Sequence, residues 1–212
     1  MADNVYKDLI REIPLAELVE IRTARKPERV EEYPFDSSLP YVDIRMLESG
    51  VPNRFAEDYR YTIGGGDLVM VKDGYRSGKV FRTQKEGVAA STLAILTPRH
   101  EDVLTDYLYC YLAYCYEDLQ NNKKGDFIGH LDLNYLKQLK VPVPDVSKQE
   151  EIAEQYQRIE SMTNETREKA LQLKELSIKL ENKELKEASE NLNLQVENIM
   201  KSWLHQIFNK SL

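Results

Sequence analysis

The stretch from Gly66 to Phe81, GDLVMVKDGYRSGKVF, carries the pattern that decides the fold of the first part of this chain. Residues 68–71 form an apolar run of strand length, and residues 79–82 resume strand character after a turn. Asp73-Gly74 is a turn signal, because both residues readily adopt positive φ. The stretch therefore predicts a buried strand, a tight turn bearing cations and an aromatic ring, and a return strand.

Flanking segments extend this hairpin into a mixed α+β domain. Residues 39–44 alternate in polarity like a strand, and residues 89–96 form another buried strand. Residues 105–119 are rich in tyrosine, with apolar side chains at three- and four-residue steps, which predicts a buried helix. We expect a globular head over residues 1–146.

A short helix is predicted near the end of the head, over residues 133–139. Asp132 precedes it, and its carboxylate can accept hydrogen bonds from the free amides of the first turn. We therefore expect Asp132 to be the N-cap.

The rest of the chain, residues 147–212, has a different composition. All 9 glycines and all 8 prolines lie at or before Pro144, and the remainder is rich in Glu, Lys, Leu and Gln, which favour helix. Apolar residues follow a heptad seam up to Leu180, and a second seam starts at Leu185 in another phase. This predicts either one long helix with a phase slip or a helical hairpin that breaks near residues 189–193.

A seam of this length exceeds what the small head can bury, so it predicts a coiled coil with a partner helix. The partner would come from a second copy or from another protein. The predicted pairing residues are Ile159, Met162, Leu173, Leu176, Leu180, Leu192, Ile199 and Trp203.

The charge distribution limits how this chain could bind a polyanion. Its formal net charge is −7, which argues against non-specific nucleic-acid binding by the whole surface. Residues 72–85 nevertheless contain five cations against Asp73 alone, and a second basic cluster surrounds Arg22 and Lys26. Clusters of cations on a protein of negative net charge indicate that phosphate binds at one place only. Ordinary solvated surface charge gives the same pattern and is the alternative.

The turn between the two predicted strands, at residues 72–79, carries side chains that can bind DNA. An arginine can fork onto guanine or phosphate, a lysine supplies a point charge, and tyrosine and serine can hydrogen-bond to bases or phosphates. An ordinary hairpin with a polar tip is the alternative. The candidate DNA-binding residues are Arg22, Lys26, Arg45, Lys72, Tyr75, Arg76, Ser77, Lys79, Lys123 and Lys124.

The sequence shows no convincing catalytic or metal-binding constellation. Its three histidines are far apart, and Cys110 and Cys115 at i, i+5 in a predicted helix do not suit zinc, so we expect buried structural thiols. Asp145 with the Glu-x-Lys triplets at residues 181–183 and 184–186 superficially matches a nuclease motif, but the triplets fall on the charged face of a helix.

The sequence also predicts a cytosolic protein. No run of 18 apolar residues is present, and residues 1–4 lack the basic and apolar regions of a signal peptide. Two cysteines are consistent with reduced thiols in that compartment.

An ordered series of segments resembles the target-recognition domain of type I restriction–modification specificity (S) subunits. The resemblance covers nearly the whole chain. The matching segments are the GDLVMVKDGYRSGK stretch at residues 66–79, LPYVDIR at 39–45, ASTLAIL at 90–96, YLYCYL at 107–112, IGHL at 128–131, LKVPVP at 139–144 and QEEIA at 149–153, which resembles the start of the family's spacer helix.

The resemblance implies a non-catalytic protein that binds double-stranded DNA, reads half of a bipartite target and holds methyltransferase (M) and restriction (R) subunits. AdoMet, ATP and Mg²⁺ would belong to those partners. Family members usually carry two domain-plus-helix units, whereas this chain has one, so two copies or two different halves would pair, antiparallel, through the tails. Rival interpretations are a coiled-coil decoy or inhibitor without a DNA role and, less favoured, a nuclease.

Overall fold

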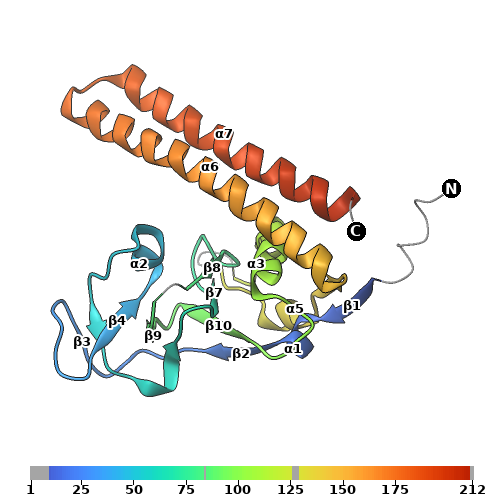
Figure 1. Ribbon diagram of the computed structural model, residues 1–212. Helices are drawn as coiled ribbons and strands as arrows, with labels where there is room; N and C mark the ends of the chain where they lie inside the picture. The colour runs from blue at the N-terminus through green and yellow to red at the C-terminus, as the bar shows by residue number, and fades with distance from the viewer. Residues whose placement is uncertain (1–9, 84, 126–128, 211–212) are drawn as a thin grey trace.

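The computed structural model describes residues 10–83, 85–125 and 129–210 (Figure 1). Residues 1–4, on which the expectation about a signal peptide rests, and Ile128 of the IGHL segment lie outside them. The elements, in chain order, are β1 (Arg11–Pro14), α1 (Leu15–Leu18), β2 (Val19–Thr23), β3 (Val30–Glu31), β4 (Leu39–Val42), α2 (Ile44–Ser49), β5 (Phe55–Ala56), the 3₁₀ turn η1 (Tyr59–Tyr61), β6 (Thr62–Ile63), β7 (Leu68–Val71), β8 (Val80–Arg82), β9 (Gly87–Ala89), β10 (Leu93–Pro98), α3 (Thr105–Tyr114), α4 (Tyr116–Asn121), α5 (Leu133–Gln138), β11 (Lys140–Val143), α6 (Val146–Lys179) and α7 (Lys183–Lys210).

Over the residues that the structure describes, three sheets build the head. An antiparallel sheet has the order β2-β10-β7-β8, a five-stranded sheet has the order β3-β5-β4-β9-β6, and β1 pairs with β11. The predicted hairpin is confirmed, because β7 and β8 pair antiparallel with Val69 opposite Phe81. The buried strand predicted over residues 89–96 is instead divided between β9 and β10, since a turn closed by the bond from Leu93 N to Ala90 O (2.9 Å) sends the chain into the other sheet.

The predicted helices of the head are present with one change. The helix expected over residues 105–119 ends at Tyr114, and α4 follows after Cys115. The predicted cap of α5 is confirmed: the Asp132 carboxylate accepts hydrogen bonds from the amides of Asn134 (2.9 Å) and Tyr135 (3.2 Å). Such bonds satisfy amides that have no partner within the helix.

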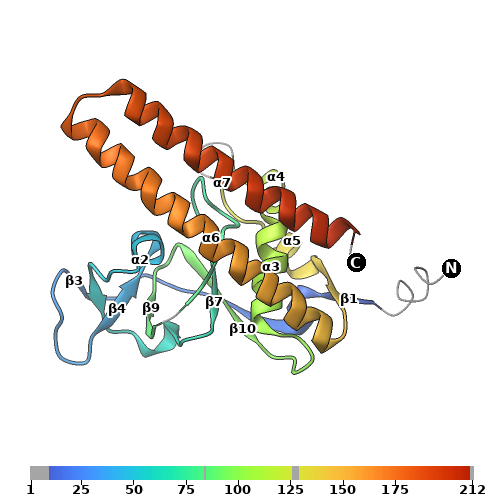
Figure 2. The same ribbon diagram turned by 45° about the horizontal axis from the view of Figure 1, so that its top comes forward.

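The tail is a hairpin of two helices that lies across the head (Figures 1 and 2). α6 and α7 have 34 and 28 residues, or about 51 and 42 Å at 1.5 Å per residue. The break falls at residues 180–182 and not near 189–193 as predicted. There Glu181 takes φ = 50°, and the Asn182 side chain accepts a hydrogen bond from Leu185 N (3.1 Å). The change of seam phase between Leu180 and Leu185 therefore marks the turn itself.

Small and polar residues line much of the contact between the two helices. Thr163, Ala170 and Ser177 of α6 are buried, as are Ser189 and Val196 of α7. The Ser189 hydroxyl donates to the Ala170 carbonyl oxygen at 2.7 Å, which requires close approach of the two backbones. Part of the α6 seam is therefore covered by α7 of the same chain.

The base of the hairpin shares a hydrophobic core with the head. Tyr107, Leu108, Tyr111 and Leu112 of α3 pack with Ile152 and Tyr156 of α6 and with Met200, Leu204 and Phe208 of α7. Ile159 and Trp203, two predicted pairing residues, lie partly buried against the same core. Their placement on an intermolecular seam is corrected, because the chain itself covers them.

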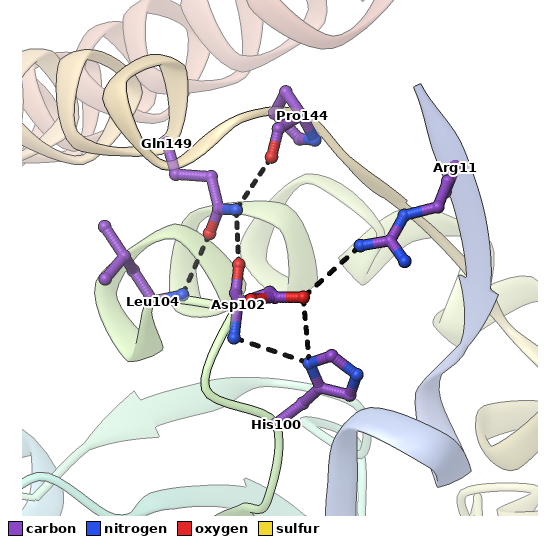
Figure 3. A network of polar contacts seen from close by, with 6 residues as sticks. All are labelled: Arg11, His100, Asp102, Leu104, Pro144 and Gln149. Atoms are coloured by element: carbon purple, nitrogen blue, oxygen red, sulfur yellow. Dashed lines mark hydrogen bonds and ion pairs between the residues drawn. The ribbon is translucent and has the colours of Figure 1, made fainter. Parts of the chain in front are cut away.

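A buried glutamine fastens the start of α6 to the head (Figure 3). The Gln149 side chain is fully buried. Its Nε2 donates to the carbonyl oxygens of Asp102 (2.8 Å) and Pro144 (2.9 Å), and its Oε1 accepts from Leu104 N (2.8 Å). The network continues outward through Asp102 to Arg11 and His100. Together, these three hydrogen bonds of the Gln149 side chain fix the angle between α6 and the head.

Both cysteines are buried, as predicted. Burial raises the pKa of the Cys115 thiol to about 12 and raises that of Cys110 as well. Burial thus disfavours the thiolate, which is the reactive form of a cysteine. Within the described ranges, no helix has an apolar stretch long enough to cross a membrane.

Candidate nucleic-acid interface

The cationic turn, residues 72–79, connects β7 to β8 and is held by backbone hydrogen bonds. Gly78 N donates to Val71 O (2.7 Å), Lys72 N donates to Thr92 O (2.7 Å), and Gly74 N donates to Gly129 O (2.9 Å). Gly74 and Gly78 adopt φ = 103° and 92°, which only glycine tolerates without strain. The turn therefore presents its side chains from a fixed backbone.

The side chains of the cationic turn differ in how available they are. Tyr75 is 76% exposed, and the Arg76 guanidinium lies 5.1 Å from its ring centroid. Arg76 forms an ion pair with Glu48 of α2, and Lys79 Nζ lies 3.7 Å from the same carboxylate. Burial, followed by the positive charge of Arg76, lowers the pKa of Lys79. One acid thus partly neutralises both cations.

Ser77 does not belong to the exposed part of the cationic turn. Its side chain is 0% exposed, and its backbone carbonyl accepts a hydrogen bond from Gln120 Nε2 on α4. The prediction that this hydroxyl contacts DNA is corrected: the turn is anchored on α4 through this side, so the Ser77 hydroxyl faces the protein.

The lysines near the cationic turn also have acidic or polar neighbours. Lys72 Nζ lies 3.2 Å from the Asp73 carboxylate, and Lys124 Nζ lies 2.8 Å from that of Asp132. Lys123 Nζ donates to Gln120 Oε1 at 2.5 Å, so Gln120 links this lysine to the turn. The structure therefore brings Lys123 to the same region of the head as the cationic turn, which begins at Lys72.

Arg22 and Lys26 lie away from the cationic turn. β2, which carries Arg22, forms the edge of its sheet opposite to β8, and Lys26 follows β2 in an exposed loop. Arg22 Nη1 donates to the carbonyl oxygen of Arg60 at 3.4 Å. This basic cluster is separated from the cationic turn by the width of the sheet.

Arg45, on α2, borders a second feature of the head, a hollow of about 520 Å³. The residues that line it are Glu32, Tyr33, Arg45, Asn53 and Arg54. Sequence analysis missed all of them except Arg45. They come from two loops on either side of β4 and α2, and neither hydrophobic period nor motif spacing marks such positions.

The outer face of the hairpin, turned away from the head, retains exposed apolar side chains. Successive residues of a helix are rotated by about 100°. This rotation places Met162, Leu173, Leu176 and Leu180 on one face of α6, next to the buried residues that contact α7. The same face is opposite to the side of α6 that contacts the head. Leu192 and Ile199 occupy the matching flank of α7. Met162 is 70% exposed, Leu180 65%, Ile199 56% and Leu176 46%. These four, together with the half-buried Leu173 and Leu192, are six of the eight predicted pairing residues.

The residues behind the nuclease alternative do not come together. Asp145 is the N-cap of α6, where its carboxylate accepts from Lys148 N (2.9 Å). The Glu-x-Lys triplets lie at the turn between α6 and α7, the length of α6 away. No group of three or more potential metal ligands occurs among the residues that the structure describes.

Comparisons with known proteins define the class. Residues 9–175 match the family described as "Type I restriction modification DNA specificity domain". The chain belongs to this family. It is 22% identical over 143 residues to the "Type I restriction enzyme MjaVIII specificity subunit" of Methanocaldococcus jannaschii, an alignment that covers 66% of this chain and 33% of the relative.

Solved structures support the fold. A chain from a study of complex assembly and conformational transition of the type I R-M system aligns with a TM-score of 0.60 and 17% identity, covering 96% of this chain and 46% of that one. The HsdS subunit from Thermoanaerobacter tengcongensis aligns with a TM-score of 0.56 and 17% identity, over 96% and 45% of the two chains. The present chain thus spans about a third to a half of the length of the relatives it matches.

Proposed function

We propose that this chain is a half specificity subunit, which reads one half of a bipartite DNA target and pairs through its tail with a second half. The observation that carries the proposal is a DNA specificity domain match over residues 9–175 together with a helical hairpin whose outer face has exposed apolar residues. The division into a reading head, residues 1–146, and a pairing and spacing region, residues 147–212, is part of this proposal.

The outer face is the proposed pairing surface. Met162, Leu176, Leu180 and Ile199 would be costly to leave in water, since full burial of such a side chain is worth about 1.5–3 kcal/mol. A second copy provides the same stripe, and a two-fold axis would place the two hairpins against each other. Antiparallel pairing would set the two heads at opposite ends of the helical assembly.

The assembly would hold M subunits and, for cleavage, R subunits. In this proposal those subunits bind AdoMet, ATP and Mg²⁺, and the present chain is not a catalyst. They would also supply phosphate contacts, which suits a reader whose own net charge is −7. A role in the cytosol follows from the same proposal.

Two experiments test it. Light scattering on the purified full chain should give the mass of a dimer, and a monomer at all concentrations would contradict self-pairing. Selection from a random duplex pool, with and without a candidate M subunit, should enrich one short sequence. A pool that stays random under both conditions would contradict the role as a reader.

A second candidate is a paired helical decoy or inhibitor that keeps the fold without reading DNA. It is favoured by one observation: Glu48, Asp73 and Asp132 partly neutralise the cations of the predicted interface. A decoy would still pair and bind M subunits, but it would enrich no DNA sequence and would reduce the activity of a complete specificity subunit.

A further inference from the structure

The residues that line the hollow lie on α2 and on the loops after β3 and before β5. Figures 1 and 2 show β3, β4 and α2 at the end of the head opposite to β1. α2 separates it from the cationic turn: Arg45 on one side of α2 lines the hollow, and Glu48 further along contacts Arg76 and Lys79. The hollow and the cationic turn are therefore neighbouring parts of one surface.

Arg54 is held in place inside this hollow. Its Nη2 donates to Oδ2 of Asp43, and the guanidinium carbon lies 4.8 Å from the ring centroid of Tyr41. Asp43 is itself fixed, because it is 7% exposed and its Oδ1 accepts from Met46 N (3.0 Å) as the N-cap of α2. A guanidinium supported by a buried carboxylate and an aromatic face loses little entropy when its remaining N–H groups bind a planar partner.

The other side chains at the hollow are available for binding. Over the described ranges, Arg45, Asn53, Tyr33 and Glu32 form no hydrogen bond or ion pair through their side chains, and all four are exposed. Tyr33 is 78% exposed, although a tyrosine buries a large surface when it finds a partner. The hollow thus combines one fixed arginine with four uncommitted polar groups.

The mixture of donors and acceptors indicates what the hollow would recognise. Arg45 and Arg54 only donate, Glu32 only accepts, and the Asn53 amide does both. A phosphate offers acceptors alone, and Glu32 would repel it. A base pair in the major groove presents donors and acceptors side by side: O6 and N7 of guanine suit arginine, N6 and N7 of adenine suit asparagine, and N4 of cytosine suits a carboxylate.

We propose that this hollow reads base edges of the DNA half-site, with Arg54 and Arg45 opposite guanine, while the cationic turn positions the backbone. The inference rests on the proposed function and adds to it the residues that choose the sequence. Arg54 is the central reader, because its geometry is set before DNA arrives.

The test uses the full chain, with its M subunit if that is needed for binding, and a duplex pool with a randomised central segment. Wild-type protein is compared with Arg54→Lys, Arg45→Ala and Asn53→Ala. Arg54→Lys keeps a cation beside Asp43 but removes the planar fork. Arg99→Ala is the matched control, since Arg99 is an exposed arginine of the head that pairs with Glu20, outside the hollow. Circular dichroism and melting confirm that each variant is folded.

The variants of the hollow should lose discrimination at one or two positions of the selected sequence, by about fivefold to 150-fold per position. Their affinity for unrelated duplex should change less than twofold, and Arg99→Ala should select the wild-type sequence. Unchanged selection by all three variants, or an equal loss of affinity for every duplex, would overturn the inference while leaving the reader role intact. If wild-type protein itself selects nothing, the proposed function fails first, and the inference fails with it.

Discussion

Gln149 and Leu104, 45 positions apart in sequence, are joined where the hairpin meets the head: Leu104 N donates to Oε1 of Gln149 at 2.8 Å. The same side chain binds the carbonyl oxygens of Asp102 and Pro144 (Figure 3). This fully buried amide determines where α3 begins and how α6 leaves the sheet. In the proposed function, the spacing of the two half-sites would depend on that angle.

Gln149→Leu should destabilise the chain by about 2–4 kcal/mol, because it leaves one buried N–H and two carbonyl oxygens without partners. Urea denaturation followed by circular dichroism measures the change. Gln172→Leu is the control, since Gln172 is exposed on the same helix. Equal stability of the two variants would show that water or a shifted backbone replaces these bonds.

Alanine should be tolerated less well at Gly78, in the cationic turn, than at Gly66, which precedes β7. Gly66 and Gly78 both have positive φ, but a Cβ at Gly66 meets open space, whereas one at Gly78 lies 3.0 Å from Leu119 Cβ. Gly66→Ala should cost about 1–2 kcal/mol through backbone strain. Gly78→Ala should cost about 1–3 kcal/mol more through overpacking. Thermal melting compares them, and a milder effect at Gly78 would contradict the packing against α4.

Phe208→Ala should loosen the end of α7. The ring lies 5.2 Å from the centroid of Tyr111 and 5.0 Å from that of Tyr114, and it is 7% exposed. Truncation of a buried aromatic costs about 3–5 kcal/mol, and a site near a helix end should fall at the lower limit. Denaturant unfolding and proteolysis of α7 report the effect. Leu194→Ala, at an exposed position, should change stability by less than about 0.5 kcal/mol.

Glu48→Gln should strengthen DNA binding if the cationic turn contacts phosphate, because it releases Arg76 and Lys79 from a shared carboxylate. Exposed ion pairs are worth about 0.2–1 kcal/mol, so affinity should rise by up to about fivefold at low salt. Arg76→Ala or Lys79→Ala should weaken binding and reduce the salt dependence. Binding is measured in a salt titration.

Glu17→Gln is the control for Glu48→Gln. It removes the same charge at an exposed position of α1. An equal gain in both variants would show that net charge alone matters, and no effect of any of the changes at Glu48, Arg76 and Lys79 would argue against a role for the turn.

Charged side chains on the outer face of the helical hairpin should disrupt the proposed dimer. Leu180→Glu combined with Ile199→Glu should convert a dimer into monomers, since each places a carboxylate on the proposed pairing surface. Leu171→Glu is the matched control, because Leu171 is 56% exposed on the other flank of α6. Light scattering gives the masses. A dimer that survives the double change, or dissociates equally with Leu171→Glu, would place the interface elsewhere.

Much of the local structure could be predicted from sequence. The hairpin of β7 and β8, the Asp132 cap and the buried cysteines follow from apolar runs, turn residues and side-chain chemistry that act over a few positions. The break of the tail could be located only roughly, because neither glycine nor proline marks residues 180–182 and the change of seam phase was the sole signal.

The candidate site was less accessible to sequence reasoning. The cationic turn was found because its charges are contiguous in the chain. The fixed Arg54 was missed because its supports, Asp43 and Tyr41, come from a strand end and a helix cap more than ten residues earlier. Ser77 was assigned wrongly, since nothing local shows that α4 covers one side of the turn.

The sequence by itself determined the hairpin of β7 and β8, the longer helices and the presence of an apolar seam on the tail. These properties depend on neighbours within one or two turns of backbone. Only the tertiary structure decided that α7 returns along α6, that Phe208 docks on α3, and that residues of two loops and of α2 together line the hollow. The physical reason is that burial is shared among segments distant in sequence, and a periodic pattern specifies that a face needs covering without specifying what covers it.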